Sequence, residues 1–362
     1  MRYKIGFFLP ALESKGGVVV SVQTIANHLK ELGHEVHLFP IGKTTTKETP
    51  FLHPINSNYK SKQLQLVKKL YAKESAKRKF DLLVSNHLIS NYILHHLDVG
   101  DQHLMVLRQP SLLKHANVLS KIKKRILFPK IYNHKNIVMI SQCLLDDFLT
   151  KHPYLKPKSS RVIYNSYDPE LLDIKAKEKI NLPTEKEYII SVGRFTKTKN
   201  QSMLIHAFEK VSNKNIDLIL LGDGKETHSL KILVNKLNLN ERVHFIGWKK
   251  NPYPYIKHAK LLVHTSKSET FGRVVLEGLA LNTPVISTDI KCGPNEILTD
   301  ELKDFLVPLN DISLLTEKIE LALKHYPAIE SKHLEKFKVD SIAQVYIDFI
   351  KEMAHYHDEC LK

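Results

Sequence analysis

Two glutamates, Glu269 and Glu277, lie on either side of a glycine and the start of an apolar helical pattern. A helix N-terminus offers unpaired backbone N–H groups and a partial positive charge, which suit a phosphate. Glu277, on the helix, could accept hydrogen bonds from ribose hydroxyls, whereas Glu269, in the loop, would face the group attached to the phosphate. The pattern predicts a site for a nucleotide-linked, polyhydroxylated ligand. The alternative is a solvated loop followed by an ordinary helix with two surface carboxylates.

A basic turn precedes this element. The strand-like stretch that ends at Gly193 is followed at once by Arg194, Lys197 and Lys199. A glycine leaves room for close approach of a ligand, and the cations could neutralise a diphosphate, including the charge that grows as a bond breaks. The alternative is a simple basic turn on the surface.

Further glycine turns follow predicted strands in the same half of the chain. They are Leu221-Gly222-Asp223-Gly224, Phe245-Ile246-Gly247-Trp248 and Gly293-Pro294-Asn295-Glu296-Ile297. The carboxyl ends of parallel strands share one edge of a sheet, where ligands bind in open α/β folds. We therefore expect these turns to open on one edge.

The elements that must position these residues alternate between strand and helix almost throughout. We predict two α/β units with parallel sheets, residues 1–167 and 168–339, with a lysine-rich linker at 168–186 and a last helix, 340–362, that packs back on the first unit. A ligand would then bind in a cleft between two facing Rossmann-like domains. The predicted strands are 4–9, 35–40, 81–85, 103–108, 136–140 and 161–164, then 188–192, 216–221, 243–246, 260–264, 284–288 and 304–307.

Composition restricts the class of protein. The chain has 362 residues, 43% hydrophobic and 25% charged, as is usual for a soluble globular protein. It has no apolar run of about 18 residues that would predict a transmembrane helix, and its first ten residues predict a buried strand rather than a signal peptide. The three cysteines form no C-x-x-C pair, which favours a reducing cytoplasm and argues against structural zinc.

The net charge of +16 predicts attraction to a polyanion. Basic residues concentrate in the stretches 60–79 and 114–135, where apolar residues recur at helical spacing. Such basic amphipathic helices can lie on an anionic membrane surface, or they can simply cover a sheet. No nucleic-acid motif accompanies the charge, so a nucleic-acid partner is not expected.

With these elements in place, the chain resembles the retaining glycosyltransferases of family 4, which have the GT-B fold. The resemblance rests on the glutamate element, Gly193-Arg194 with Lys199, and the glycine turns, and on further segments along nearly the whole chain. These are Gly16-Gly17, Gly33-His34-Glu35-Val36, Ser141 after Val138-Met139-Ile140, Val162-Ile163-Tyr164-Asn165-Ser166-Tyr167-Asp168 and Pro284-Val285-Ile286.

The resemblance implies a division of labour. The second unit would hold the nucleotide-sugar and the first the acceptor. Arg194 and Lys199 would bind the diphosphate, Glu277 the ribose, and Glu269 the donor sugar together with the backbone of Thr270, Phe271 and Gly272. Gly17 would approach the phosphates, and Gly247 and Trp248 would lie near the base. Arg194, Lys199 and Glu269 are the predicted catalytic residues. Family members need no metal or other cofactor, and the chain contains no Asp-x-Asp motif.

The chain departs from the family pattern in the first unit. Where a histidine commonly ends a strand near the acceptor, this sequence has Arg108, which could recognise a phosphate or an acidic sugar. His87 also follows a predicted strand and is the other acceptor-side candidate, although it could be a hydrogen-bonded packing histidine. Thr270 replaces a usual glycine.

The sequence thus predicts a bacterial, metal-independent glycosyltransferase at the cytoplasmic face of the cell membrane. It would move a hexose or N-acetylhexosamine from a UDP-sugar to a saccharide or lipid-linked acceptor in lipopolysaccharide or capsule assembly. Two alternatives stay open: a non-catalytic scaffold on the membrane surface, and another two-domain nucleotide-dependent enzyme such as a dehydrogenase. No G-x-G-x-x-G follows a predicted strand, which disfavours the dehydrogenase.

Overall fold

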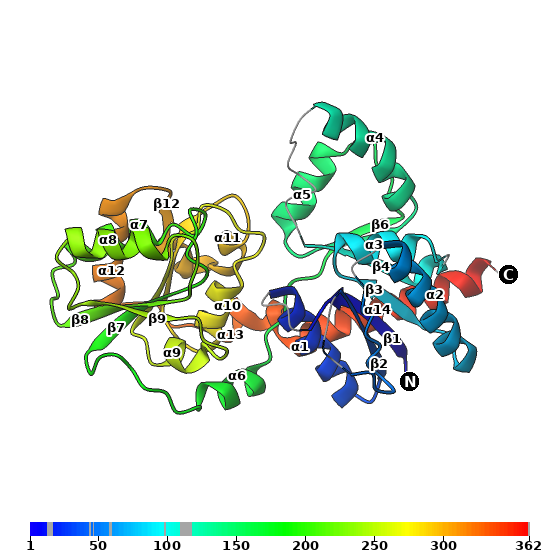
Figure 1. Cartoon of the computed structure of the whole chain (residues 1–362), viewed down its shortest axis with the longest axis horizontal. Helices are drawn as coiled ribbons and strands as arrows, with labels where there is room; N and C mark the ends of the chain where they lie inside the picture. The colour runs from blue at the N-terminus through cyan, green and yellow to red at the C-terminus, as the bar shows by residue number, and fades with distance from the viewer. Residues whose placement is uncertain are drawn as a thin grey trace. The chain divides into compact units, whose positions relative to one another are not determined.

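The computed structural model describes residues 1–12, 17–42, 45, 47–57, 60–97, 99–108 and 118–360, without the side chains of 60, 61, 118–124 and 356–360. The chain divides into two units, one formed by Met1–Ser166 with Phe337–Lys362 and the other by Tyr167–Lys336. Each contains one six-stranded sheet (Figure 1). Gly16 and the part of the basic stretch 114–135 that precedes residue 118 lie outside this description, as do the side chains of Lys121, Lys123 and Lys124.

The first unit is built on a parallel sheet with the strand order β2-β1-β3-β4-β5-β6. Its strands are β1 (Lys4–Pro10), β2 (Glu35–Ile41), β3 (Leu82–Ser85), β4 (His103–Leu107), β5 (Asn136–Met139) and β6 (Ser159–Val162). The strands β1 to β5 are the predicted ones. β6 begins two residues before its predicted start, in register with β5 through Asn136 and Ser159.

Helices connect the strands of this sheet, and a last helix returns to the first unit. They are α1 (Gly17–Glu31), α2 (Lys60–Lys77), α3 (Leu88–His95), η1 (Gly100–Gln102), α4 (Val118–Tyr132), α5 (Gln142–Lys151) and α14 (Val339–Cys360). Val67 of α2 belongs to a core cluster with Phe39 and Phe80, and Leu64 and Tyr71 pack against it. The apolar face of α2 therefore covers the sheet, while Lys68, Lys69 and other lysines of the helix are exposed.

The second unit has its own parallel sheet, with the order β12-β11-β10-β7-β8-β9. Its strands are β7 (Glu187–Val192), β8 (Ile216–Leu221), β9 (Val243–Gly247), β10 (Leu261–His264), β11 (Val285–Asp289) and β12 (Leu306–Pro308). The chain runs outward from β7 through β8 to β9 and then returns to the other side of β7 at β10. This reversal of strand order is the point where ligands bind in open α/β sheets.

The helices of the second unit close the core around this sheet. They are α6 (Pro169–Ala176), α7 (Gln201–Lys210), α8 (Thr227–Lys236), α9 (Tyr253–Lys257), α10 (Arg273–Ala280), α11 (Pro294–Ile297), η3 (Asp300–Phe305), α12 (Ile312–Lys324) and α13 (Ser331–Leu334), with η4 (Glu335–Phe337) at the boundary. The predicted linker is wrong in one respect, because it contains α6. The Asp168 side chain accepts a hydrogen bond from the Leu171 N–H and Pro169 follows it, so a capping signal begins this helix.

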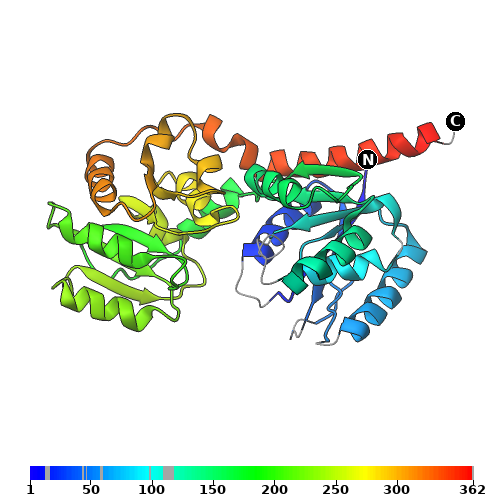
Figure 2. The ribbon, with the colours of Figure 1, turned by 90° about the horizontal axis from the view of Figure 1, so that it is seen from above.

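The C-terminal helix α14 belongs to the first unit, although the whole second unit lies between it and the rest of that unit in the chain. Ile342, Tyr346 and Phe349 are buried, and the Tyr346 ring packs edge-on against Phe7 of β1. Figure 2 shows this long helix lying along the first unit. Within the described residues, no helix is both long enough and apolar enough to span a bilayer.

Candidate functional site

The switch point of the second sheet brings together the turn after β7 and the loop after β10. The Lys267 N–H donates to the Thr198 carbonyl at 2.7 Å, and the Thr265 hydroxyl donates to the Asn200 carbonyl at 3.0 Å. These bonds fix the basic turn against the glutamate loop. Residues about 70 positions apart in sequence, Lys199 and Glu269, thereby form an ion pair.

Glu269 is held by two neighbours. Its Oε1 accepts from Lys199 Nζ and also lies 3.0 Å from His264 Nε2, at the end of β10. Burial alone would raise the pKa of the Glu269 carboxyl, but the hydrogen bond from His264 and the charge of Lys199 outweigh it and lower the pKa to about 2. Burial lowers the pKa of His264. The site therefore contains an ionised carboxylate, which can only accept hydrogen bonds.

Arg194 lies on the same turn, at the end of β7, and its side chain is exposed. In the part of the chain that the structure describes, no hydrogen bond or ion pair engages its guanidinium. A Cβ placed on Gly193 would lie 4.0 Å from the methylene carbons of Lys199, so the lysine side chain passes beside the glycine. The turn thus presents Arg194 as a free cation and Lys199 as a cation paired with Glu269.

The turns after β7 and β8 depend on glycine. A Cβ on Gly222 would lie 1.9 Å from the Gly193 carbonyl oxygen, and a Cβ on Gly224 would lie 2.2 Å from the Phe195 carbonyl oxygen. Because the two turns approach each other so closely, the Phe195 N–H can donate to the Asp223 carbonyl at 2.9 Å. The Gly222 N–H in turn donates to Gly247, which places the predicted base-side residues, Gly247 and the exposed Trp248, on the neighbouring strand end.

Helix α10 begins beside this edge. Gly272 precedes it in the left-handed region, with a φ of 85°, which favours glycine. Gly278 lets the helix approach β11, because a Cβ there would lie 2.7 Å from a methyl carbon of Val285. The N-terminus of this eight-residue helix, where backbone N–H groups have no partner within the helix, directly follows the loop that contains Glu269, Thr270 and the buried Phe271.

Glu277 is not a free surface carboxylate. Its Oε1 accepts from Arg273 Nε at 2.8 Å and from the Tyr253 hydroxyl at 3.3 Å, and the residue is buried. Burial alone would lower the pKa of the Arg273 guanidinium, but the negative charge of Glu277 outweighs this effect and raises the pKa. The predicted ribose ligand is therefore part of a buried Arg–Glu–Tyr cluster.

Sequence reasoning missed His264, Arg273 and Tyr253. The i, i+4 spacing of Arg273 and Glu277 on one helix face is a readable signal for their ion pair. For His264 the sequence offers no such signal, because a histidine at the end of an apolar strand looks like a core residue.

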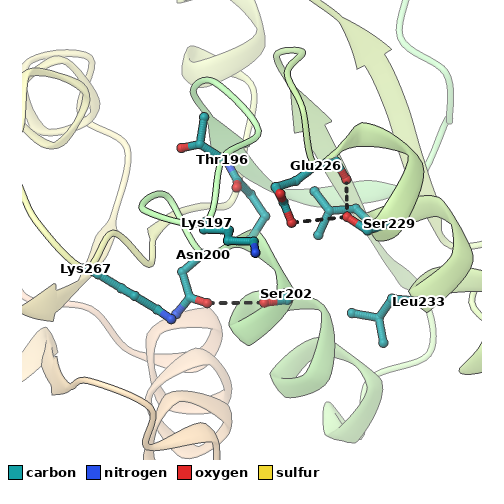
Figure 3. A pocket seen from close by; sticks show the side chains of 10 residues that line it. Thr196, Lys197, Asn200, Ser202, Glu226, Ser229, Leu233 and Lys267 are labelled. Atoms are coloured by element: carbon teal, nitrogen blue, oxygen red, sulfur yellow. Dashed lines mark hydrogen bonds between the residues drawn. The ribbon is translucent and has the colours of Figure 1, made fainter.

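A pocket of about 240 Å³ lies next to this edge and is a separate feature. Figure 3 shows Lys197, Lys267, Asn200 and Glu226 around it, at the N-terminus of α7 and beside α8. Its lining includes neither Glu269 nor Glu277. The predicted donor residues therefore do not form the walls of this pocket.

The acceptor-side candidates lie in the first unit. His87 precedes α3, and its Nδ1 lies 2.8 Å from the Ser90 hydroxyl, while burial lowers its pKa to about 4. Arg108 donates to Asn86 Oδ1 at 3.0 Å, to Ser21 Oγ at 3.2 Å and to Asn165 Oδ1. Both side chains have intramolecular partners. Gly17, the first residue of α1, is exposed.

Comparison with known proteins adds to this geometry. Residues 173–338 match the family model described as glycosyl transferases group 1. A protein named as an uncharacterized glycosyltransferase of Methanocaldococcus jannaschii is 35% identical over 188 residues, 49% of this chain and 45% of that relative. The matched part therefore spans about half the length of that relative.

A second relative matches more of the chain. It is the N-acetylgalactosamine-N,N'-diacetylbacillosaminyl-diphospho-undecaprenol 4-alpha-N-acetylgalactosaminyltransferase of Campylobacter jejuni, 29% identical over 248 residues, 66% of this chain and 67% of the relative. Among solved structures, Anabaena HepE in complex with UDP and glucose aligns with a TM-score of 0.72 and 19% identity, covering 97% of this chain and 100% of that one. The predicted GT-B fold is confirmed by this likeness.

Proposed function

We propose that this protein is a group 1 glycosyltransferase that uses a UDP-sugar as donor and retains the configuration of the sugar it transfers. The observation that carries the proposal is the switch point of the second sheet, where Lys199 pairs with Glu269 in the loop before α10 and the exposed Arg194 lies on the same turn as Lys199. The family match over residues 173–338 supports the reaction class.

In this proposal the cations take the role of a metal. Arg194 and Lys199 bind the diphosphate and stabilise the charge that develops on the departing phosphate. The N-terminus of α10 adds its partial positive charge. Breaking the bond between the anomeric carbon and the phosphate oxygen leaves the electron pair on the UDP, and the acceptor hydroxyl supplies the new oxygen while its proton goes to the leaving phosphate.

Glu269 positions the donor sugar. As an ionised carboxylate it accepts hydrogen bonds from sugar hydroxyls, and its bonds to Lys199 and His264 fix where its oxygens lie. Glu277 accepts from the ribose through the lone pairs that Arg273 and Tyr253 leave unused. The transferred group is a hexose or N-acetylhexosamine.

For the acceptor we propose a lipid-linked saccharide of bacterial surface glycan assembly, bound by the first unit at an anionic membrane. The likeness to a relative whose named substrate is a diphospho-undecaprenol supports this class. Helix α4 is the element that would touch the membrane, because Ile126 and Leu127 are 62% and 47% exposed beside the exposed Arg125. The apolar face of α2 is already used in the core.

The donor is tested by a thermal-shift screen of the purified chain against UDP-, GDP-, ADP- and CMP-sugars without added metal. We expect stabilisation by UDP-sugars, and its loss in Arg194→Ala. The configuration of the product, read by NMR after transfer to a lipid-diphosphate saccharide, tests retention. Stabilisation by none of the four nucleotides would favour the scaffold, and stabilisation by NADH alone would favour the dehydrogenase.

The membrane contact is tested separately. The double change Lys123→Glu with Lys124→Glu in α4 should reduce sedimentation with anionic vesicles, whereas Lys68→Glu with Lys69→Glu in α2 should reduce it less. Equal binding by the native chain and the α4 variant would remove α4 from the proposal and leave the donor assignment intact.

A further inference from the structure

A group of buried polar side chains lies in the first unit, at the edge of its sheet and apart from the residues assigned above. His37 is on β2, His53 is in the segment that follows this strand, and Glu74 is on α2; each is 2% or 3% exposed. One imidazole nitrogen from each histidine and one oxygen of Glu74 all lie within 4.8 Å of one another. Three separate stretches of chain thus place metal-ligand atoms at one point.

The two imidazoles face each other through a short contact that two neutral rings satisfy poorly. His37 Nε2 lies 2.9 Å from Glu35 Oε1. A carboxylate at that distance requires a proton on Nε2, so in the neutral ring His37 Nδ1 carries a lone pair. This Nδ1 lies 2.9 Å from His53 Nε2.

Neither neutral tautomer of His53 suits its surroundings. If Nε2 carries the proton, the lone pair of His53 Nδ1 is buried, has no hydrogen-bond partner among the described residues, and faces Glu48 Oε1 at 3.6 Å. If Nδ1 carries the proton instead, two lone pairs confront each other across 2.9 Å. A metal ion between the facing nitrogens removes the conflict, because both nitrogens then donate to it.

We propose that His37, His53 and Glu74 form a structural site for a first-row divalent metal ion, with Zn²⁺ as the best match. Two imidazoles and one carboxylate are a known zinc ligand set, in which a water molecule takes the fourth tetrahedral position. Ligand atoms of a tetrahedral zinc ion are about 3.3 Å apart, so the facing nitrogens need to separate by only a few tenths of an ångström.

The surroundings of these ligands are those of a metal site. Glu35 would orient His37 and Glu48 would orient His53, as carboxylates do for zinc-bound histidines. Lys4 and Lys77 lie near Glu35 and Glu74, at 3.5 and 3.1 Å, so three carboxylates face two lysines and leave an excess of negative charge for a cation.

The proposed ion has a structural consequence. His53 belongs to a segment that pairs with β2 through its own N–H, which donates to the Leu38 carbonyl at 2.8 Å. Bound metal would fasten this segment and α2 to the edge strand. The inference does not depend on the proposed transfer reaction, since none of its residues is assigned to donor or acceptor.

The test is metal uptake by the full-length chain, first stripped with a chelator and then titrated with Zn²⁺ or Co²⁺. We expect one ion per chain, visible absorption of bound Co²⁺ typical of nitrogen and oxygen ligands, and a higher melting temperature with Zn²⁺. His53→Gln and Glu74→Gln should each weaken binding at least about tenfold, the range seen when a metal-site contact is lost.

A matched control is available in the second unit. Asp300, Glu301 and His333 also bring ligand atoms within 4.8 Å, but the two carboxylates are on less buried residues. His333→Gln should leave the uptake of one ion unchanged.

If His53→Gln does not fold, NMR of isotope-labelled histidines in the native chain still tests the proposal, because Zn²⁺ should shift the imidazole signals of two histidines. Absence of uptake, or uptake that survives both site variants, would overturn the proposal and leave only a shared proton between the rings.

Discussion

At the scale of single residues, Glu269 shows how a buried site keeps a charge. Its carboxylate is stabilised by His264 and Lys199 against the cost of burial, and its pKa falls to about 2 from an ordinary value of 4.5. A depressed pKa in the folded state stabilises the fold above the pKa of the unfolded chain. That stabilisation is lost as the pH falls from about 4.5 toward 2.

The pH dependence of unfolding checks this pair of contacts. We expect the free energy of unfolding of the native chain to fall by on the order of 3 kcal/mol between pH 5 and pH 2 as Glu269 becomes protonated. In Glu269→Gln this part of the dependence should be absent. Glu209→Gln, at an exposed position on α7, is the control. Identical pH profiles for the native chain and Glu269→Gln in denaturant titrations would disprove the assignment.

Glu277 carries a second residue-scale prediction. Its removal leaves the buried guanidinium of Arg273 without its carboxylate, so Glu277→Ala should cost about 3 kcal/mol of stability. The double variant Arg273→Met with Glu277→Leu should be more stable than Glu277→Ala, because no unpaired charge remains.

The single and double variants also separate a structural role of Glu277 from a role in donor binding. If Glu277 contacts ribose, donor affinity falls in Glu277→Ala and stays low in the more stable double variant. If donor affinity returns with stability in the double variant, Glu277 has only a structural role. Isothermal titration with a UDP-sugar, alongside denaturant unfolding, gives both quantities.

At the scale of elements, the glycine turns determine how the strand ends meet. Gly222→Ala should destabilise the second unit by about 3 kcal/mol or more, because a φ of 150° is combined with a Cβ inside the Gly193 carbonyl. Gly33→Ala, with a φ of 87° and open space around it, should cost only about 1–2 kcal/mol. Chemical denaturation of both variants tests this, and equal losses would mean that the close approach is unimportant.

The same elements show how far sequence reasoning reaches. The parallel strands were predictable because apolar runs alternated with helical patterns, and the meeting of Lys199 with Glu269 followed from strand ends sharing one edge. Helix α6 was missed because its capping residue, Asp168, stands before a lysine-rich stretch with little periodicity. The cluster of His37, His53 and Glu74 has no spacing motif, since each member comes from a different element.

At the scale of the whole molecule, the second unit is a continuous segment with its own core. Leu204, Leu220 and Ile286 are among the fully buried residues of that core. We expect a fragment of residues 167–336 to unfold in one cooperative transition and to keep the UDP-sugar affinity of the donor site. A fragment that shows no melting transition by circular dichroism would contradict this.

The folding of the first unit, in contrast, depends on the distant helix α14. Removing α14 would expose the face of Phe7 that Tyr346 covers, together with the side chains that pack on α1. A chain ending at Lys336 should therefore keep the transition of the second unit and lose that of the first. Limited proteolysis should then degrade residues 1–166 first, whereas equal resistance of both units would show that α14 is dispensable.

The place of α14 in the chain also matters during synthesis on the ribosome. Residues 1–166 emerge before the second unit, yet the helix that completes their unit is translated after the whole second unit. The second unit can fold as soon as it emerges, while the first waits with the apolar surface for Ile342 and Tyr346 uncovered. The nascent first unit is therefore the part of this protein that most needs a chaperone.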